Sequence, residues 1–367
     1  MELMKASRQW ATRPADQRFL NLHELLDVST KAFERGRQKN ISTRALEVQP
    51  ANDDQMNGLQ IVGSNGRPAL ATHWSFGQLA QLAGAPAGYL RDLPAPIVAD
   101  CMNYGLKFNR KAEDIKVLLS LAETDDAPHD LRAATGPNYG RIWNKHIVEA
   151  LINRVGDGAT GNFKVPGEFG KDVAITRDNT TIYGSDRDMF VFLADEKNRV
   201  TVDNRRNGQQ GSLARGFFLW NSEVGSQSIG FSTFLFDYAC CNRIVWGAQD
   251  YREIRIRHTT SAPDRWMDEV MPTLVAYSES SARSTEETIK HAQQRKVEAV
   301  EDFLAKRFTK TIARGAIKAH EAEEGRPIET MWDAVTGVTA YAKSISYQDE
   351  RVTVERGAGK LLDLVAA

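Results

Sequence analysis

Apolar positions recur with helical spacing in several segments of the first half of the chain. In RFLNLHELLDVSTKAFERG the spacing of the leucines predicts a helix that ends at Gly36, and NKHIVEALINRV predicts a second helix that ends at Gly156. A third helical block is predicted over about 75–105. GLQIVGSNGRPALAT predicts a hairpin around Asn65-Gly66, because that dipeptide tolerates the positive φ of a tight turn. IKVLLSLA is a candidate buried strand, and LRAATGPNYGRI is expected to form a turn.

Short strand-like runs dominate the middle of the chain. Between residues 164 and 258, runs such as DMFVFLA and REIRIRH are separated by clusters of Gly, Asn and Asp. From residue 262 onward the pattern changes to long helical runs with few glycines. The sequence therefore predicts an α+β fold, with a central, mainly antiparallel sheet flanked by helices and a helical C-terminal region. We expect an N-terminal helical and hairpin region over 1–113, a β-rich core over 114–261 and a C-terminal helical region over 262–367.

The most apolar and aromatic stretch is RGFFLWNSEVGSQSIGFSTFLFDYACCNRIVWG, residues 215–247. We expect it to supply the core of the sheet, and NSEVG to connect two of its strands. Asn and Ser favour turns through side-chain bonds to the backbone, Gly225 can adopt a positive φ, and Glu223 can fix the loop by pairing with a nearby arginine. The core side chains predicted here are Phe217, Leu219, Phe231 and Leu235.

Composition is that of a folded protein without a strong overall charge. The 367 residues are 41% hydrophobic and 26% charged, with a formal net charge of −1, so a nucleic-acid contact must come from a local basic patch. Cys101 and the adjacent Cys240-Cys241 give no framework of disulfides, which favours a reducing compartment. No stretch is long and apolar enough for a signal or a membrane span. We therefore expect a cytoplasmic protein that makes no membrane contact.

Motifs for catalysis, metals and nucleotides are weak. The seven histidines are scattered, no CxxC or HExxH occurs, and we expect neither a metal nor a cofactor. GDGATG satisfies G-x-G-x-x-G but follows a helix instead of a strand, and Ser222 has no histidine at a recognised spacing. The acidic segment ETDDAPHD leaves a divalent-cation enzyme open as a third hypothesis. Catalysis is less favoured than binding.

Two segments carry features of nucleic-acid binding. In WSFGQLAQLAGAPAGYLRDLP, Ala80 precedes Gly84 by four residues, as in a helix-turn-helix, although the second helix offers few side chains that could read bases. Between residues 199 and 258, eight arginines stand against five acids, with nine aromatic residues among them. REIRIRH places Ile254 and Ile256 on one face and Glu253, Arg255 and Arg257 on the other. Such a surface is typical of proteins that bind single strands without reading sequence. The side chains expected to bind are Arg205, Arg206, Arg215, Trp220, Tyr251, Arg255 and Arg257.

Several of these segments resemble a known family. FGQLAQLAGAPAGYLRDLP, LRAATGPNYGRIWNKHIVEAL, the NSEVG block with its surroundings and the tail TMWDAVTGVTAYAKSI resemble, in this order, phage and plasmid proteins grouped as domain-of-unknown-function family 932. This chain reads Cys240-Cys241-Asn242 where the family pattern has a single Cys-Asn pair. The resemblance implies a bacteriophage or mobile-element protein of a bacterial host cell and transfers no catalytic residue.

Two hypotheses follow from the residues and from this resemblance. The first is a non-catalytic nucleic-acid-binding protein of phage or plasmid DNA metabolism, acting on single-stranded DNA during recombination. The second is a self-assembling or host-protein-binding module, in which the aromatic run and the C-terminal helices form protein interfaces. Both are compatible with a homo-oligomer.

Overall fold

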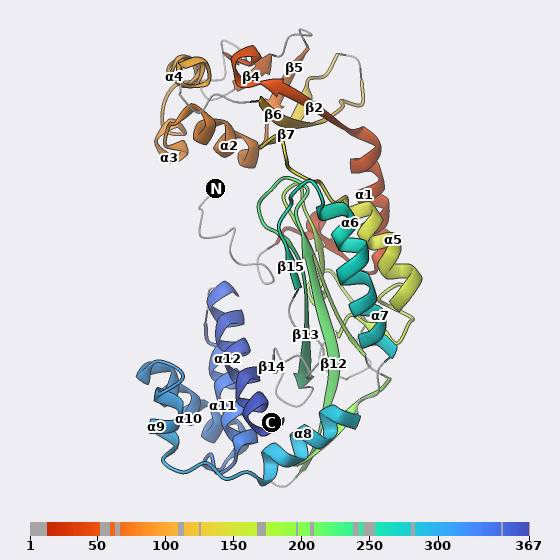
Figure 1. Ribbon diagram of the computed structural model, residues 1–367, viewed down its shortest axis with the longest axis vertical. Helices are drawn as coiled ribbons and strands as arrows, with labels where there is room; N and C mark the ends of the chain where they lie inside the picture. The colour runs from red at the N-terminus through yellow and green to blue at the C-terminus, as the bar shows by residue number, and fades with distance from the viewer. Residues whose placement is uncertain are drawn as a thin grey trace.

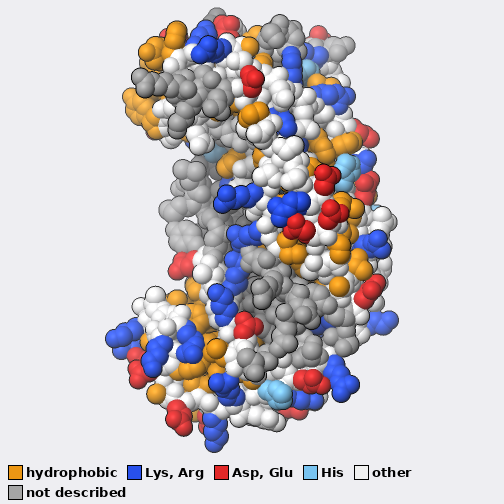
Figure 2. Space-filling model, viewed as in Figure 1, with side chains coloured by type: hydrophobic (Ala, Val, Ile, Leu, Met, Phe, Trp, Pro, Cys, Tyr) orange, Lys and Arg blue, Asp and Glu red, His pale blue; other side chains and the backbone are white. Residues whose placement is uncertain are grey.

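The computed structural model describes residues 13–51, 59–62, 67–108, 114–124, 126–166, 174–195, 197–205, 209–237, 242–244, 254–279, 283–345 and 348–366. Within them the chain forms two sheets and a C-terminal group of helices (Figure 1). The smaller sheet and its helices lie at one end, the larger sheet lies in the middle, and the C-terminal helices lie at the other end beside it. Figure 2 shows that the surface is hollowed between the two ends. The predicted α+β fold is confirmed.

The larger sheet contains nine strands within the described residues, and all of its pairings are antiparallel. The path runs β1-β9-β10-β12-β13-β14, with β11 beside β12, β15 beside β13 and β8 beside β10. The bounds are β1 Arg18–Phe19, β8 Phe163–Lys164, β9 Ile182–Gly184, β10 Met189–Asp195, β11 Val200–Arg205, β12 Gln209–Asn221, β13 Ile229–Asp237, β14 Asn242–Ile244 and β15 Ile254–Ile256.

Helices cover one face of this sheet (Figure 1). They are α1 (Leu22–Arg35), α5 (Asn144–Val155), α6 (Ala262–Arg265) and α7 (Met271–Glu279), with one π-helical turn, η5 (Trp266–Val270), between the last two. Phe217, Leu219 and Phe231 are fully buried against these helices, as predicted, because alternate residues of a strand point to the same face. The predicted ends of α1 at Gly36 and of α5 at Gly156 are also confirmed.

The smaller sheet has the order β2-β6-β7-β5-β4-β3 within the described residues. Its strands are β2 (Gly36–Ser42), β3 (Glu47–Pro50), β4 (Leu59–Val62), β5 (Pro68–Ala71), β6 (Asp114–Ser120) and β7 (His129–Thr135), and a single 3-10 turn, η3 (Thr43–Ala45), joins β2 to β3. The helices α2 (His73–Ala83), α3 (Ala87–Leu90) and α4 (Ala95–Phe108) pack on it. A second short turn, η2 (Ala15–Gln17), precedes β1.

The smaller sheet corrects two predictions. Because β6 pairs with β2, and β7 pairs with β5, the sheet crosses the region boundary that was placed at residue 113. Residues 131–135 (LRAAT) form the buried end of β7 instead of a turn. The predicted hairpin is present as β4 and β5, while Asn65-Gly66 lies outside the described residues.

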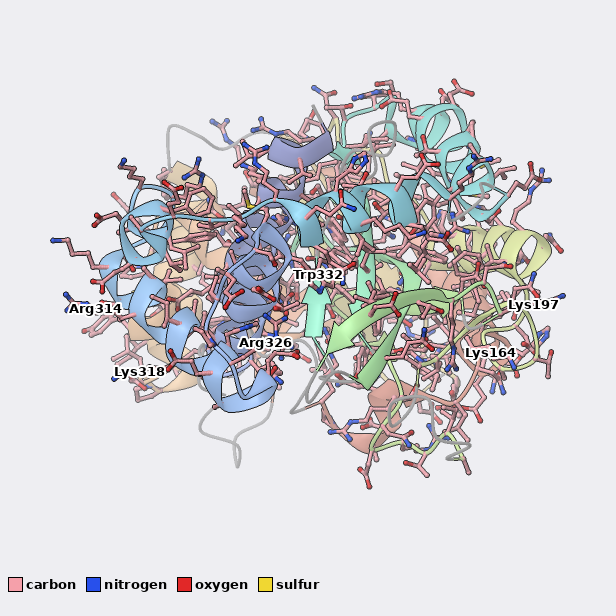
Figure 3. All side chains as sticks on the ribbon, turned by 90° about the horizontal axis from the view of Figure 1, so that it is seen from below. Lys164, Lys197, Arg314, Lys318, Arg326 and Trp332 are labelled. Carbon is pink, nitrogen blue, oxygen red and sulfur yellow. The ribbon has the colours of Figure 1, made fainter. Side chains whose placement is uncertain are left out.

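The C-terminal helices share a core with one end of the larger sheet. They are α8 (Arg283–Gln294), α9 (Val300–Ala305), α10 (Lys310–Glu324), α11 (Met331–Ala342) and α12 (Gln348–Ala366). Trp332 is buried in this core, which also takes Val202 of β11 and Leu235 of β13 (Figure 3). Leu235 is therefore a core residue as predicted, although its neighbours come from the C-terminal helices. None of the helices in the described ranges has both the length and the apolar character required to cross a membrane.

Candidate functional site

The face of the larger sheet opposite its helices is lined with aromatic rings. This aromatic face consists of Tyr183, Phe190, Phe192, Ala194, Ala214, Phe218, Trp220 and Phe234. The rings of Phe192 and Phe234 have centroids 4.4 Å apart, and those of Phe218 and Trp220 are 5.6 Å apart. All residues of the aromatic face are at most 6% exposed. Rings buried to this degree cannot serve as open platforms for nucleic-acid bases, so any role of this face depends on what the rings hold in place.

Trp220 holds the guanidinium of Arg255. Arg255 lies on β15 opposite Gly230 of β13, and its Cζ is 5.4 Å from the centre of the Trp220 ring. Trp220 reaches across Gly230, where a Cβ atom would lie 2.0 Å from the indole. The glycine therefore makes the space in which the indole lies flat against the sheet. The indole face attracts the cation and fixes its position while the residue stays exposed.

The alternation predicted for REIRIRH is present in β15. Ile256 is fully buried in the core under the helices, Ile254 packs against that core, and Arg255 is exposed on the opposite side. Arg257, directly after the strand, is also exposed. Lys and Arg side chains form a column over this part of the molecule, along the hollow beside the sheet (Figure 2). Of the predicted arginines whose side chains the structure describes, Arg255 and Arg257 are the two at the surface.

Arg215 does not belong to this surface, and its predicted place on an exposed basic face is wrong. The residue is 3% exposed, its Nη2 lies 3.4 Å from Oδ2 of Asp195, and its guanidinium lies over the ring of Tyr277. Arg215 shares the inward parity of Phe217 and Leu219 along β12, so the strand directs it under the helices. In that position its guanidinium contacts groups of the protein core and cannot reach a nucleic acid at the surface.

The remaining predicted site residues cannot be placed. Arg206 and Tyr251 lie outside the described residues, and so do Cys240 and Cys241. Arg205 ends β11, but its side chain is not described. Their roles stay predictions. Four further cations lie toward the two sides of the molecule: Arg314 and Lys318 lie on α10, and Lys164 and Lys197 lie at the opposite side (Figure 3).

A second polar cluster joins the two sheets, and we call it the Glu223 junction. Oε2 of Glu223 lies 2.9 Å from Nη2 of Arg132 on β7, and Oε1 accepts a hydrogen bond of 2.9 Å from the backbone N–H of Asn144 at the start of α5. The backbone carbonyl of Glu223 accepts a hydrogen bond from Arg141. Glu223, Arg132 and Arg141 are at most 8% exposed. The predicted pairing of Glu223 with an arginine is confirmed.

The rest of the NSEVG loop is held equally firmly. The hydroxyl of Tyr139 donates to the carbonyl of Ser222 at 2.8 Å, and Trp74 and Gln78 of α2 both donate to the carbonyl of Val224. Val224 is fully buried between Leu118 and Ala133 of the smaller sheet. Gly225 has φ +84°, as expected for the turn. The loop at the end of β12 therefore inserts Val224 into the core of the smaller sheet and anchors the two sheets to each other.

Burial shapes the titration of this junction. It raises the pKa of Tyr139 well above its usual range, and it lowers the pKa of Arg141 to about 10. Burial also lowers the pKa of His258, whose ring stacks on Tyr139 at 4.8 Å and whose Nδ1 lies 3.0 Å from the carbonyl oxygen of Gly140. An arginine whose pKa is about 10 still carries its charge at neutral pH. The junction thus contains two cations around one carboxylate, closed off from solvent, which suits a rigid joint better than a reaction centre.

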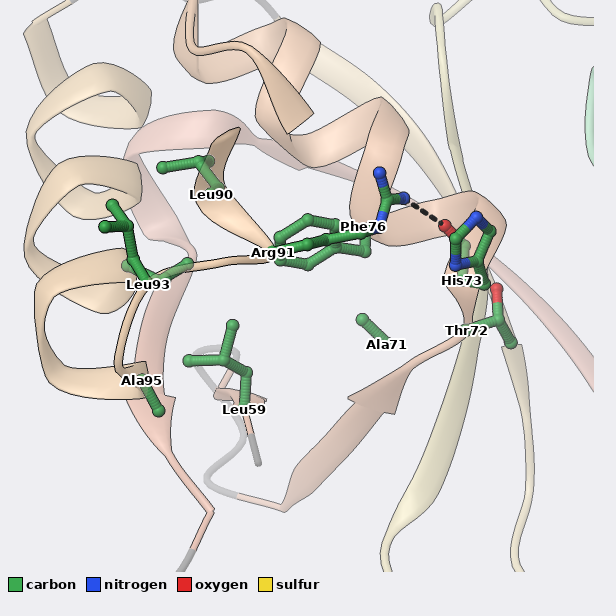
Figure 4. Close-up of a pocket in the computed structure, with 10 residues that line it drawn as sticks. Leu59, Ala71, Thr72, His73, Phe76, Leu90, Arg91, Leu93 and Ala95 are labelled. Carbon is green, nitrogen blue, oxygen red and sulfur yellow. Dashed lines mark hydrogen bonds between the residues drawn. The ribbon is translucent and has the colours of Figure 1, made fainter. Parts of the chain in front are cut away.

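A small pocket lies between the smaller sheet and its helices (Figure 4). Its volume is about 330 Å³, and it is lined by apolar residues, Leu59, Phe76 and Leu93 among them, together with polar groups of Thr72, His73 and Arg91. Arg91 lies over the Phe76 ring and donates to the carbonyl of His73 at 3.1 Å, so its charge is engaged at the rim. The pocket can accept a small apolar group beside a cation.

The segment predicted to resemble a helix-turn-helix has a short second helix. Gly84 ends α2 in the left-handed conformation, with φ 74°, as that pattern requires. However, α3 contains four residues, about one helical turn, and a recognition helix needs greater length to present side chains along a groove. Leu90 and Leu93 instead help to line the pocket. This segment packs the smaller sheet.

Sequence reasoning missed the partners in the Glu223 junction, although it found the carboxylate. Arg132 and Arg141 lie in the segment that was expected to be a turn, and the contacts span 91 and 82 positions of the chain. Among the described residues no group of three or more His, Cys, Asp or Glu side chains is placed to hold a metal. In the acidic segment 123–130, Glu123 pairs with Arg35.

Comparison with known proteins gives one match. The family described as a domain of unknown function, DUF932, matches residues 175–358, which include the NSEVG loop, β15 and most of the C-terminal helices. No curated protein and no solved structure matches the chain. The match covers half of the sequence and agrees with the resemblance found from the residues. The chain therefore belongs to the DUF932 family.

Proposed function

We propose that this protein binds single-stranded nucleic acid through its phosphate backbone, along the hollow beside the larger sheet. The observation that carries the proposal is Arg255, an exposed guanidinium fixed over Trp220 on the side of the sheet away from the helices. Arg257 follows two positions later and is also exposed. A fixed cation loses little side-chain entropy when it meets a phosphate, so it binds better than a mobile one.

The aromatic face refines the expected mode of binding. Because Trp220 is 6% exposed, bases cannot stack on it, and its role is to position Arg255. Contacts to phosphates alone give binding that is independent of sequence and weakens steeply with salt. Arg205, Arg206 and Tyr251 remain proposed ligands of the same strand of nucleic acid, whereas Arg215 is excluded by its burial.

The setting is part of the same proposal. Binding of single strands by their backbone leaves the bases available for pairing, which is the property that strand annealing in phage or plasmid recombination requires. We place this activity in the cytoplasm of a bacterial host cell. The alternative, a self-assembling module without nucleic-acid binding, predicts no affinity for any oligonucleotide.

The test is fluorescence anisotropy with a labelled oligothymidylate, titrated at several salt concentrations. The double variant Arg255→Ala, Arg257→Ala should bind more weakly, and the slope of log K against log salt should fall by about 1.4, because each contact to a single-strand phosphate contributes about 0.7. Arg265→Ala is the matched control, because Arg265 is half-exposed on α6 and pairs with Glu269. Wild-type protein that does not bind at low salt, or a double variant with an unchanged slope, would overturn the proposal. Equal affinity for duplex DNA would overturn the preference for single strands.

A further inference from the structure

Helix α4 carries an apolar stripe on its outer side. Its inner residues pack on the smaller sheet, and Met102 and Leu106 are fully buried. On the outer side Ile97, Tyr104 and Phe108 are 49%, 71% and 69% exposed, and Tyr104 and Phe108 are the two most exposed large apolar residues among those described. Cys101, a free thiol, is exposed between them. Burying such side chains releases about 25 cal/mol per Å² of apolar surface, so the stripe favours a partner.

The spacing along this stripe is that of a helix-pairing seam. Positions 97, 101, 104 and 108 are separated by four, three and four residues, which keeps all of them on one side of the helix. The rings of Tyr104 and Phe108 lie 5.1 Å apart and form a continuous surface. A second helix with the same spacing can interdigitate with it, and a second copy of this chain supplies such a helix.

We propose that α4 pairs with α4 of a second copy, antiparallel about a twofold axis. In that arrangement Ile97 of one copy lies opposite Phe108 of the other, and Cys101 lies opposite Tyr104, so each layer combines one larger and one smaller side chain. An interface of this kind is self-complementary, and it closes at two copies.

The charges beside the stripe select the antiparallel direction. Asp100 and Lys107 are both exposed and follow the seam on the same side, seven residues apart. In the antiparallel pair Asp100 of each copy faces Lys107 of the other, so two opposite-charge pairs form by symmetry. In a parallel pair each residue lies level with the same residue of the other chain, so Asp100 faces no Lys107 and no Asp–Lys contact forms. The surface is thus complementary to itself in charge as well as in shape.

The size of the contact sets its strength. Fourteen residues of helix extend over about 21 Å, at a rise of about 1.5 Å per residue, which is small beside the interface of a permanent dimer. We therefore expect a dimer that dissociates at concentrations on the order of micromolar. It uses a surface on the smaller sheet's helices and is independent of the basic surface on β15.

Sedimentation equilibrium across a wide range of protein concentration tests this pairing. Wild type should change from monomer to dimer, and Tyr104→Glu should stay monomeric. Asp100→Lys and Lys107→Asp should each weaken the dimer at least about fivefold, because both symmetric charge pairs become repulsive. The double variant Asp100→Lys, Lys107→Asp should restore the wild-type affinity. Met267→Glu, which replaces an exposed apolar side chain elsewhere, should leave it unchanged.

Two further measurements keep the outcomes distinct. Equal melting temperatures of the variants show that they fold, as expected for exposed positions. The alkylation rate of Cys101 should fall as wild-type protein is concentrated and stay constant in Tyr104→Glu. Wild type that is monomeric at every concentration, or a dimer that survives Tyr104→Glu, overturns the proposal. A double charge variant that fails to regain affinity overturns the antiparallel register. Oligonucleotide binding by a monomer would leave the proposed function standing.

Discussion

Oε2 of Glu223 lies 2.9 Å from Nη2 of Arg132, and this pair connects the larger sheet to the smaller one across a buried joint. The loop that carries Glu223 begins at the end of β12, while Arg132 lies in the middle of β7. Val224, next in the chain, is fully buried between side chains of the smaller sheet. The ion pair and the apolar plug together fix the distance and direction between the sheets, and therefore the shape of the hollow between the ends of the molecule.

Removing the Glu223 carboxylate should destabilise the protein strongly. Glu223→Ala leaves Arg132 and Arg141 buried without a counter-charge, which should lower the free energy of unfolding by about 3 to 5 kcal/mol in urea denaturation at neutral pH. The double variant Glu223→Met, Arg132→Met should lower the free energy of unfolding much less than Glu223→Ala does, because it removes the cation of Arg132 together with the carboxylate. A loss below about 0.5 kcal/mol in Glu223→Ala would show that the pair does not stabilise the joint.

His258 should make stability depend on pH in the mildly acid range. Burial lowers its pKa in the folded protein, with Arg141 adding to the effect and the hydrogen bond to Gly140 opposing it. The unfolded chain therefore takes up the proton first, at about pH 6.5. The contribution of neutral His258 to stability is complete above that pH and is lost as the pH falls through the folded pKa.

Unfolding free energies measured between neutral pH and about pH 5 would test this dependence. His258→Gln should lose less stability than wild type over that interval, and a remaining slope is expected because the pKa of His73 is also lowered by burial. His23→Gln, at an exposed position on α1, should follow the wild-type curve. Parallel curves for wild type and His258→Gln would contradict the assignment.

Local patterns were sufficient for much of the larger sheet and its helices. The apolar face of α1 follows from helical spacing and its end from the poor helix propensity of glycine at position 36, and β10 and β15 follow from their apolar runs and flanking turns. The smaller sheet could not be inferred in the same way. Its strands come from both sides of a helical block, and the end of β7 is buried at five consecutive positions, so it shows no alternation. Pairings of this kind depend on long-range packing.

For the candidate site, the burial of Arg215 could have been predicted from the sequence. Arg215 has the same parity along the strand as Phe217 and Leu219, so the alternation that placed those two in the core also places Arg215 there. On β15, Arg255 alternates with the inward-facing Ile254 and Ile256, and this alternation correctly predicted its exposed position. The cation–π contact with Trp220 could not be foreseen, because β15 joins β13 through a connection whose path the sequence does not specify.

Glycine at position 216 should be required by the aromatic face. A Cβ atom there would lie 2.2 Å from the ring of Phe234 and 2.6 Å from the carbonyl oxygen of Leu193, and the latter belongs to the backbone of β10. Gly216→Ala should therefore destabilise the protein by about 1 to 3 kcal/mol through overpacking. Gly88→Ala is the control, because nothing lies within 4 Å of its added Cβ, and it should stabilise α3 by up to about 1 kcal/mol. Thermal melts that shift equally for both would refute this.

The burial of Arg215 separates its effect on stability from any effect on binding. Arg215→Ala removes one partner of an ion pair whose side chains are 4% and 1% exposed, so the charge of Asp195 remains buried and the free energy of unfolding should fall by about 3 to 5 kcal/mol. If enough folded protein remains, its affinity for single-stranded DNA at low salt should equal that of wild type, because a side chain under the helices cannot reach a phosphate. Arg255→Ala should give the reverse result, with reduced affinity and nearly unchanged stability. Equal losses of affinity in the two variants would mean that the strand of nucleic acid reaches the core side of β12, contrary to the position of the helices.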